Sequence, residues 1–198
     1  MSRQAERSEA TRGKLIGAGR KLFARRGYAD VGTEEIVGRA KVTRGALYHH
    51  FEDKRDLFRA VHEQVEAELT ETIAAQLAAG GARDPLEVLI GGMRTFLDAC
   101  VDPEVQRIAL MDAPAVLGWA EWRRVEEEYG LGLVIAALEM AIESGALRRQ
   151  PVRPLAHVLL AAMSEAGMLI ATSDDPGAAR DEVESALIAL LEGLRARA

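Results

Sequence analysis

The chain has 198 residues, a hydrophobic content of 48%, one cysteine and a formal net charge of −6. The hydrophobic content excludes a disordered chain, and the single cysteine, Cys100, excludes a disulfide scaffold and a cysteine metal cluster. Abundant alanine, leucine, glutamate and arginine predict an all-α fold, and an unpaired cysteine fits a reducing cytoplasm.

The sequence of the first 54 residues predicts three helices. Residues 8–26 have an apolar stripe with helical spacing and are followed by Gly27, a usual C-terminal stop. Residues 33–40 and 44–51 predict two further helices, joined by a turn at residues 41–43. Thr33 and Thr43 are the expected N-cap residues of these two helices.

Residue 53 onward predicts a long fourth helix followed by several others. Asp53 caps residues 54–79, where Leu57, Phe58, Val61 and Val65 keep helical spacing, and two glycines at 80–81 end the helix. Residues 80–85 are the expected linker. Five later helices are predicted over residues 85–100, 103–111, 119–144, 151–172 and 176–197. The expected total is about nine helices and no strand.

No signal peptide or membrane span is expected. The N-terminal residues are polar and lack an apolar core. The longest apolar candidate, residues 155–172, is interrupted by His157, Ser164 and Glu165, so no run reaches the roughly 18 residues that a span needs. We therefore expect a cytoplasmic protein with no membrane contact.

Charge is distributed unevenly along the chain. Residues 1–60 contain 14 Lys and Arg against 8 Asp and Glu, whereas the remainder contains 11 against 23. A basic segment on an acidic body indicates a polyanionic partner for the segment alone. A chance fluctuation in charge is the alternative.

The two helices around the turn have the size of a helix-turn-helix that lies in a DNA major groove. With about 100° per residue, Leu47 and Phe51 point towards the core, whereas Gly45, Ala46 and His49 point the opposite way. This small outward face lets the backbone approach the groove. Four residues are therefore expected at the bases, with Arg44 best placed for guanine: Arg44, Gly45, Ala46 and His49. Four are expected at phosphates: Thr33, Tyr48, His50 and Lys54.

The segment GALYHHFEDK at residues 45–54 resembles the signature of the tetracycline-repressor (TetR) family, and the likeness extends over residues 8–54. Thr33, Tyr48, His50 and Lys54 match that family's phosphate-contacting positions. Its base-reading positions are matched by Arg44, Gly45 and Ala46, with His49 close by. The resemblance implies a DNA-binding domain at residues 1–54 and a helical effector-binding and dimerisation domain at residues 55–198. Lys41 departs from the family pattern, because many members have glycine in this turn. A left-handed conformation there costs lysine about 1 kcal/mol more than glycine, and we expect the turn to tolerate it.

The resemblance places an effector pocket among the helices of the second domain. Aromatic and methionine side chains make adaptable apolar cavities, although any one of them can instead be plain core. The expected lining residues are Met93, Phe96, Leu97, Cys100, Met111, Trp119, Trp122, Tyr129 and Met163. Arg94, Glu121 and Glu165 are possible polar anchors.

Two apolar stripes near the C-terminus predict a homodimer interface built from four helices, two from each subunit. Their expected interface residues are Leu155, Leu159, Ala162, Val183, Leu187, Leu190, Leu191 and Leu194. The alternative is that both stripes are core within one chain.

Together these features predict a transcriptional regulator, most simply a repressor. The expected homodimer binds a palindromic operator in double-stranded DNA and is released by a small, mainly apolar effector. An effector-independent DNA-binding dimer is the alternative. The sequence contains no residue spacing typical of a catalytic site, so an enzyme is not predicted, and no cofactor is expected. His49 and His50 diverge on a helix and cannot chelate a metal together. His62 and Glu66, one turn apart, are explained better by a solvated face than by a metal site.

Overall fold

A computed structural model describes residues 3–79 and 84–196 of the chain. Ten α-helices and one π-helical segment, η1, make up its elements. Their bounds are α1 Arg3–Arg26, α2 Thr33–Ala40, α3 Arg44–His50, α4 Lys54–Ala79, α5 Pro85–Ala99, α6 Pro103–Val105, η1 Gln106–Asp112, α7 Ala113–Leu117, α8 Trp119–Glu143, α9 Val152–Ala171 and α10 Pro176–Glu192. Within the described ranges there is no strand, only an isolated antiparallel bridge between Leu147 and Arg195. The prediction of an all-α fold is confirmed.

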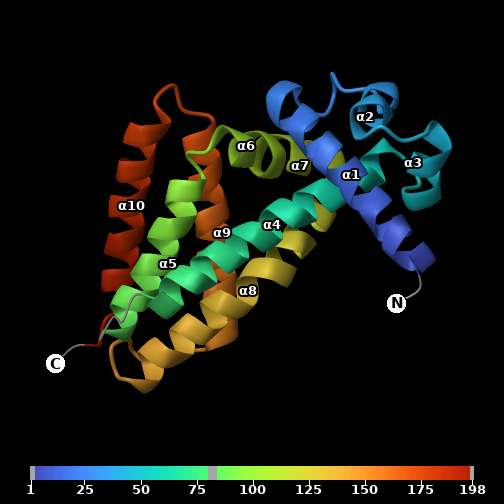
Figure 1. Cartoon of the computed structure of the whole chain (residues 1–198). Coiled ribbons are helices and arrows are strands. Elements are labelled where there is room, and N and C mark those ends of the chain that lie inside the picture. The colour runs from blue at the N-terminus through green and yellow to red at the C-terminus, as the bar shows by residue number, and fades with distance from the viewer. Residues whose placement is uncertain (1–2, 80–83, 197–198) are drawn as a thin grey trace.

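The helices form two parts joined by α4. Helices α1, α2 and α3 lie together at one end of the molecule, and α4 runs from them along α8 into a bundle that also contains α5, α9 and α10 (Figure 1). Helix α4 packs against α1 at one end and against α5 and α8 further along. The short segments α6, η1 and α7 lie between the two parts and contact α1, α4 and α9.

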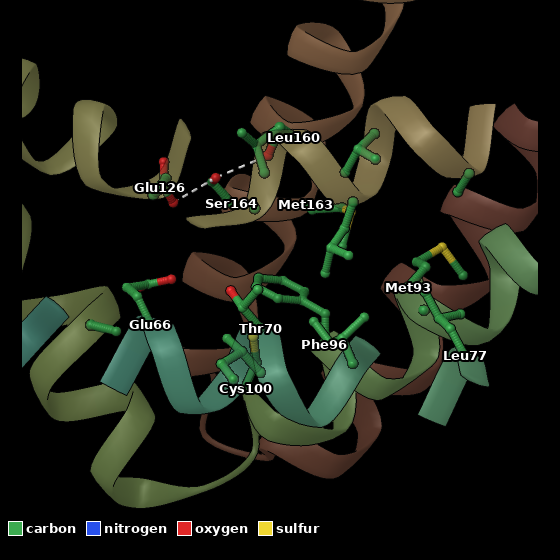
Figure 2. Close-up of a pocket in the computed structure, with 18 of the residues that line it drawn as sticks. Glu66, Thr70, Leu77, Met93, Phe96, Cys100, Glu126, Leu160, Met163 and Ser164 are labelled. Carbon is green, nitrogen blue, oxygen red and sulfur yellow. Dashed lines mark hydrogen bonds between the residues drawn. The ribbon is translucent and has the colours of Figure 1, made fainter. Parts of the chain in front are cut away.

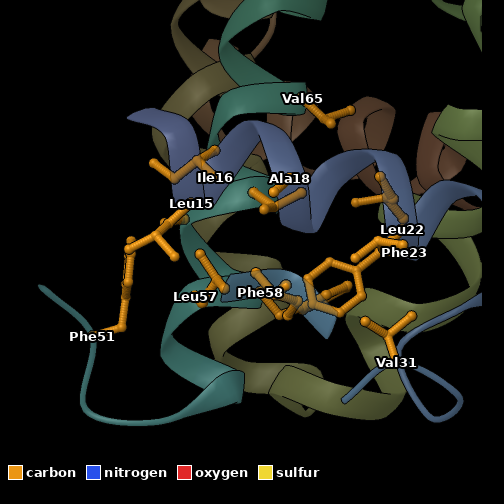
Figure 3. Close-up of a cluster of buried hydrophobic side chains, with 14 of the residues drawn as sticks. Leu15, Ile16, Ala18, Leu22, Phe23, Val31, Phe51, Leu57, Phe58 and Val65 are labelled. Atoms are coloured by element: carbon orange, nitrogen blue, oxygen red, sulfur yellow. The ribbon is translucent and has the colours of Figure 1, made fainter. Parts of the chain in front are cut away.

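The first of two hydrophobic cores, here called the N-terminal core, holds the first three helices against α4. Leu15, Phe23, Leu47 and Phe58 are fully buried in it (Figure 3 shows part of the cluster). The rings of Phe23 and Phe58 meet edge to face with centroids 5.3 Å apart, a favourable aromatic geometry. The same core continues into η1, α7 and α8, so the helix-turn-helix shares its interior with the body.

A second hydrophobic core, the body core, fills the bundle of α5, α8, α9 and α10. At Gly167 on α9 the packing leaves no room for a side chain. A Cβ built there would lie 3.1 Å from a methyl carbon of Leu110 on η1 and 3.2 Å from Sγ of Cys100. This close approach fixes η1 against α9.

Most predicted helices are present, with two corrections. Thr33 is not the N-cap of α2; Gly32 precedes the helix and no side chain caps it. Thr43 does accept a hydrogen bond from the Ala46 N–H, as predicted, at 3.1 Å. The helix expected at 103–111 instead divides into α6, η1 and α7 and continues to Leu117. The glycines at 80–81 and most of the expected linker lie outside the described residues.

The expectation about apolar runs also changes. Helix α9 is long and apolar enough to cross a membrane by length and composition. It packs against α8, η1, α10 and α5, and Ala156, Leu160 and Ile170 on it are buried in the body core. These contacts account for its apolar character.

The turn of the helix-turn-helix has a strained lysine. Lys41 has φ 55° and ψ 45°, and it is the one non-glycine residue with positive φ in the described part of the chain. Its backbone N–H closes the end of α2 by donating to the carbonyl of Gly38. Side chains rarely adopt this conformation, so the departure from the usual glycine stores strain in the turn.

Replacing Lys41 by glycine should therefore stabilise the chain. Relief of left-handed strain contributes about 1–2 kcal/mol, and the greater freedom of glycine in the unfolded chain offsets part of it, so the net gain is up to about 1 kcal/mol. Urea unfolding measures this change in the free energy of unfolding. Lys41→Ala keeps a Cβ in the same conformation and should give no comparable gain; equal stabilisation by both variants would contradict the strain.

Candidate nucleic-acid interface and effector cavity

The helix-turn-helix presents its small residues to solvent. Leu47 and Phe51 are buried, while Gly45 and His49 are exposed and Ala46 is half-buried. The outward face of α3 therefore carries little side-chain bulk, as its helical periodicity predicts. The helix fits the geometry of a recognition helix because its backbone can approach base edges.

Arg44 stands at the start of α3 and is engaged within the helix-turn-helix. Its Nη1 lies 2.9 Å from Oε1 of Glu34 on α2, and its guanidinium lies over the ring of Tyr48, 5.5 Å from the centroid. Both members of the ion pair are exposed, so solvent screens the interaction. The guanidinium is accessible from solvent and can exchange Glu34 for another acceptor.

Lys54 has a different role from the expected phosphate contact. Its ammonium donates to the carbonyls of Tyr28 and Val31, at 2.9 and 3.0 Å, and lies 4.0 Å from the centroid of the Tyr28 ring. Partial burial lowers the pKa of this ammonium. The side chain fastens the α1–α2 loop to the start of α4, which leaves the backbone N–H groups at that helix end as the candidate phosphate donors.

The other expected phosphate residues lie near the recognition helix. Tyr48 is exposed, whereas Thr33 and His50 are half-buried. Partial burial, with help from His49 and Arg12, lowers the pKa of His50. This shift favours the neutral ring, which still carries one N–H that can donate to a phosphate oxygen.

A cavity of about 80 Å³ lies among α4, α5, η1, α8 and α9. Most of its wall is apolar, and Figure 2 shows Leu77, Met93 and Phe96 on this part of the wall. At 10–15 Å³ per water-sized centre, this volume is roughly room for several waters or a small organic group. A mainly apolar cavity with a few polar groups is the usual form of a small-molecule site.

Four polar side chains face this cavity: Glu66, Thr70, Glu126 and Ser164. The Ser164 hydroxyl donates to Oε1 of Glu126 at 2.7 Å, and Nη1 of Arg123 lies 3.1 Å from Oε2. Burial raises the pKa of Glu126, although Ser164 and Arg123 oppose this shift. Burial first, and the nearby Glu126 carboxyl second, raise the pKa of Glu66 to about 8.

The residues expected to line an effector pocket coincide with this cavity only in part. Met93, Phe96, Cys100 and Met163 line the cavity. The other five expected residues do not. Leu97 and Trp122 are buried in the two cores, Met111 and Trp119 are exposed, and Tyr129 lies outside the lining. Helical spacing marks which side chains are apolar, but not which core they enter.

The three possible polar anchors do not line this cavity. Arg94 pairs with Glu184 at 2.6 Å, Glu121 pairs with Arg55 at 2.5 Å, and Glu165 is exposed. The polar residues that do line the cavity lie on the apolar stripes of their helices. This position within an apolar stripe is the sequence signal that would have found them. Ser164 and Glu126 are buried, and Glu66 follows Val65 and precedes Leu69 on α4.

His62 and Glu66 do not form a solvated face. The His62 side chain is fully buried, and its Nδ1 lies 3.8 Å from Oε1 of Glu66. Neither imidazole nitrogen has a hydrogen-bond partner among the described residues. Burial lowers the pKa of His62 to about 4, so the ring is neutral near pH 7. No group of three or more metal-ligating side chains occurs in residues 3–79 or 84–196.

Cys100 lines the cavity as a buried thiol. Burial, reinforced by Glu66 and Glu126, raises its pKa well above the usual value. Since the thiolate is the reactive form, this cysteine is chemically quiet and contributes a wall to the cavity.

Comparison with known proteins matches both parts of the chain. Residues 86–194 match the model described as the tetracyclin repressor-like C-terminal domain, and residues 15–61 match that of bacterial regulatory proteins of the tetR family. The chain belongs to the TetR family. Members of this family are DNA-binding transcriptional regulators, typically repressors, so this TetR-family chain is a regulator and not an enzyme.

Individual relatives agree over most of the chain. It is 30% identical to the Tn10 TetC protein of Escherichia coli over 145 residues, covering 73% of this chain and 72% of that protein. A crystal structure of a TetR-family regulator from Pectobacterium atrosepticum superposes with a TM-score of 0.87 and 34% identity, covering 100% and 99% of the two chains. The structure of RolR with resorcinol shares the fold, with a TM-score of 0.75 and 22% identity over 94% and 89%.

The raised pKa of Glu66 predicts how stability changes with pH in this TetR-family regulator. Its pKa is about 8 when folded and about 4.5 when unfolded, so the folded state binds more protons between these values. The stabilisation is complete below pH 4.5 and is lost as pH rises through 8. Thermal unfolding between pH 5 and 9 should show a loss of a few kcal/mol at the alkaline end.

Glu66→Gln should remove much of this alkaline loss, because the amide cannot ionise. Glu71→Gln, at an exposed position on the same helix, is the control and should keep the wild-type pH profile. Identical profiles for wild type and Glu66→Gln would show that Glu66 does not titrate in this range.

Proposed function

We propose that this chain is a homodimeric repressor that binds a palindromic operator and is released from it by a small effector bound in the cavity. The observation that carries the proposal is the position of the cavity. It lies between two elements, α4 and η1, that also pack into the N-terminal core. Residues 1–54 would bind DNA and residues 55–198 would dimerise and bind the effector, in the cytoplasm.

Helix α4 supplies the first connection. Leu57 and Val61 near its start are buried in the N-terminal core, whereas Leu69, Ile73 and Leu77 line the cavity. Because the helix is continuous, a ligand that moves its second half must also change the packing of its first half. The expected coupling free energy is about 1–3 kcal/mol, typical of allosteric pairs of sites.

The segment η1 supplies the second connection. Leu110 lines the cavity, while the neighbouring Ile108 is buried in the N-terminal core. Asp112, at the end of η1, accepts a hydrogen bond of 2.7 Å from the Tyr28 N–H in the α1–α2 loop. A ligand that pushes on Leu110 would therefore act on the loop beside the helix-turn-helix. Release of operator DNA by a compound that occupies the cavity tests this part of the proposal.

The residues expected at the dimer interface differ in how accessible they are to a partner. Leu159, Leu187 and Leu191 belong to the body core of the same chain and are not available to a partner. Leu155, Ala162, Val183 and Leu194 are half-buried against that core. Of the expected residues, Leu190 is well exposed, with 59% of its surface accessible.

Exposed apolar residues nevertheless gather on α9 and α10. Val158 and Leu169, eleven positions apart on α9, point the same way and are both more than half exposed. With Ala161 on α9 and Ala186 and Leu190 on α10, they form what we call the exposed stripe. Two copies of this stripe would pack as a four-helix interface related by a two-fold axis. Such a dimer would present two recognition helices about 34–36 Å apart.

Leu190→Glu should dissociate this dimer, because it places a charge in the centre of the exposed stripe. Sedimentation velocity should show a monomer, and operator affinity should fall at least tenfold. Met140→Glu changes another exposed apolar residue, on α8 outside the stripe, and should remain dimeric. A dimeric Leu190→Glu protein would place the interface elsewhere.

Arg44→Ala should weaken sequence preference as well as affinity. A good guanine contact contributes about 1–3 kcal/mol of discrimination, so the variant should bind the selected operator and its single-base variants more equally. The operator is first obtained by selection from random DNA, and Kd values are then measured by fluorescence anisotropy. Arg124→Ala removes an exposed, ion-paired arginine in the body and should leave the base preference intact. Unchanged discrimination in Arg44→Ala would remove this residue from base reading.

A further inference from the structure

One end of the cavity is acidic and faces no basic side chain. The lining contains Glu66 and Glu126 but no lysine, arginine or histidine. In Figure 2 the two carboxyl groups lie with Thr70 and Ser164 at one end, while Leu77 and Met93 lie at the other. The cavity is therefore divided into a polar end and an apolar end.

The two carboxyl groups differ in their partners. Glu126 is held by the Ser164 hydroxyl and by Arg123, which approaches from outside the lining. Glu66 accepts no hydrogen bond from the described residues, and its side chain keeps 14% exposure. A buried carboxyl without a donor or a cation is an incomplete arrangement, because burial disfavours its charged form.

The buried neighbour of Glu66 does not complete the arrangement. His62 points Nδ1 towards the Glu66 carboxyl at 3.8 Å, beyond hydrogen-bond distance, and both of its nitrogens lack partners in the described ranges. The ring is neutral near pH 7 and supplies no positive charge. A ligand in the cavity can approach Glu66, which lines it. Such a ligand can supply the hydrogen-bond donor and the positive charge that His62 does not supply.

We propose that the cavity binds a compact apolar molecule that carries a protonated amine, with the ammonium group placed against Glu66 beside Glu126. This inference rests on the proposed effector function and names the chemical class of the effector. An ammonium group has three donors and a positive charge, which match two carboxyl groups and the Thr70 hydroxyl at this end. A carboxylate or phosphate head would instead meet two carboxyl groups and no cation, and a neutral alcohol would bring one donor and no positive charge.

Binding of an amine should release a proton from Glu66. In the empty cavity the pKa of Glu66 is about 8, so the group is largely protonated at pH 7. An ammonium ion stabilises the carboxylate and lowers that pKa, which expels the proton. Amine affinity should then rise with pH between 6 and 8.

The other titratable groups around Glu66 include His62, Cys100, Tyr129 and Glu126. His62 on α4 is already neutral, and burial keeps the thiol of Cys100, which directly follows α5, protonated. Tyr129 on α8 has a raised pKa, caused mainly by burial. Glu126, on the same helix, is paired with Arg123. The α9 and η1 residues in the lining, Leu160, Met163, Ser164, Ala109 and Leu110, carry no titratable group there.

Matched compounds test the proposal. Benzylamine, benzyl alcohol and benzoate share one tail, and 3-phenylpropylamine, 3-phenylpropanol and 3-phenylpropanoate share a longer one. Calorimetry on the full-length protein should give the amine at least a tenfold lower Kd than the alcohol of the same tail. The carboxylate should bind weakest. Titrations at pH 7 in two buffers of different ionisation enthalpy should show proton release with the amine alone.

Variants separate the head-group contact from general packing. Glu66→Gln should cost the amine at least tenfold in affinity and abolish proton release, while alcohol binding changes less than threefold. Glu71→Gln should leave all affinities unchanged. Should Glu66→Gln fail to fold, as judged by circular dichroism, the pH dependence of amine binding to the wild type decides, and a flat profile between pH 6 and 8 overturns the proposal.

The same compounds, measured for release of operator DNA, distinguish this proposal from the broader one. Alcohols or carboxylates that bind as tightly as amines and release the operator would overturn the amine class and leave the effector-responsive repressor standing. Amines that bind with the predicted preference but leave the operator bound would support the ligand class and contradict effector release. No binding by any head group would overturn both.

Discussion

The packing of α4 is the constraint on which the rest of the structure depends. Over 26 residues, about 39 Å at 1.5 Å per residue, successive turns of this helix contribute first to the N-terminal core and then to the cavity wall. Leu57, Phe58, Val61 and Val65 fix its first half against the helix-turn-helix, and Leu69, Ile73 and Leu77 form a cavity wall. His62 and Glu66 occupy the transition between the halves. A close-packed interior transmits small displacements rather than absorbing them.

The π-helical segment η1 gives the molecule a second connection of a different kind. It is short, it contributes Ile108 and Ala109 to the N-terminal core and Leu110 to the body core, and Gly167 allows it to lie directly against α9. π-Helical turns occur often at functional sites, since their wider ring is held in place only by surrounding contacts. In this chain η1 faces the cavity through Leu110 and is hydrogen-bonded to the α1–α2 loop through Asp112.

Much of the N-terminal domain could be predicted from the sequence because local rules decide it. Helical periodicity placed Leu47 and Phe51 inside, and capping chemistry identified Thr43 and Asp53, which accept hydrogen bonds from the first turns of α3 and α4. The left-handed turn at Lys41 followed from comparison with a glycine pattern, and the backbone has that conformation. These features depend on residues close together in the chain.

The cavity and the partner-facing surface could be predicted only in part, because long-range packing decides them. An apolar stripe does not tell which neighbour will cover it: Trp122 joined the N-terminal core, and Leu187 joined the body core. The sequence favoured a solvated face for the polar residues His62 and Glu66. Glu66 and Ser164 show that a polar residue at a core position can instead face an internal space. Lys54 was assigned to phosphate from its place at a helix start, whereas loop carbonyls 23 and 26 residues away hold its ammonium.

The ion pair between Arg44 and Glu34 would make the base contact proposed for Arg44 an exchange reaction. To contact a base, the guanidinium must leave a carboxylate that is always present at the same effective concentration, because both residues belong to one rigid motif. Guanine, with two acceptors on its major-groove edge, is well suited to replace that carboxylate. A base with a poorer acceptor pattern leaves the internal pair intact. Under the base-reading role proposed for Arg44, Glu34 would compete with bases of poorer acceptor pattern, and a residue that touches no base would contribute to the choice of site.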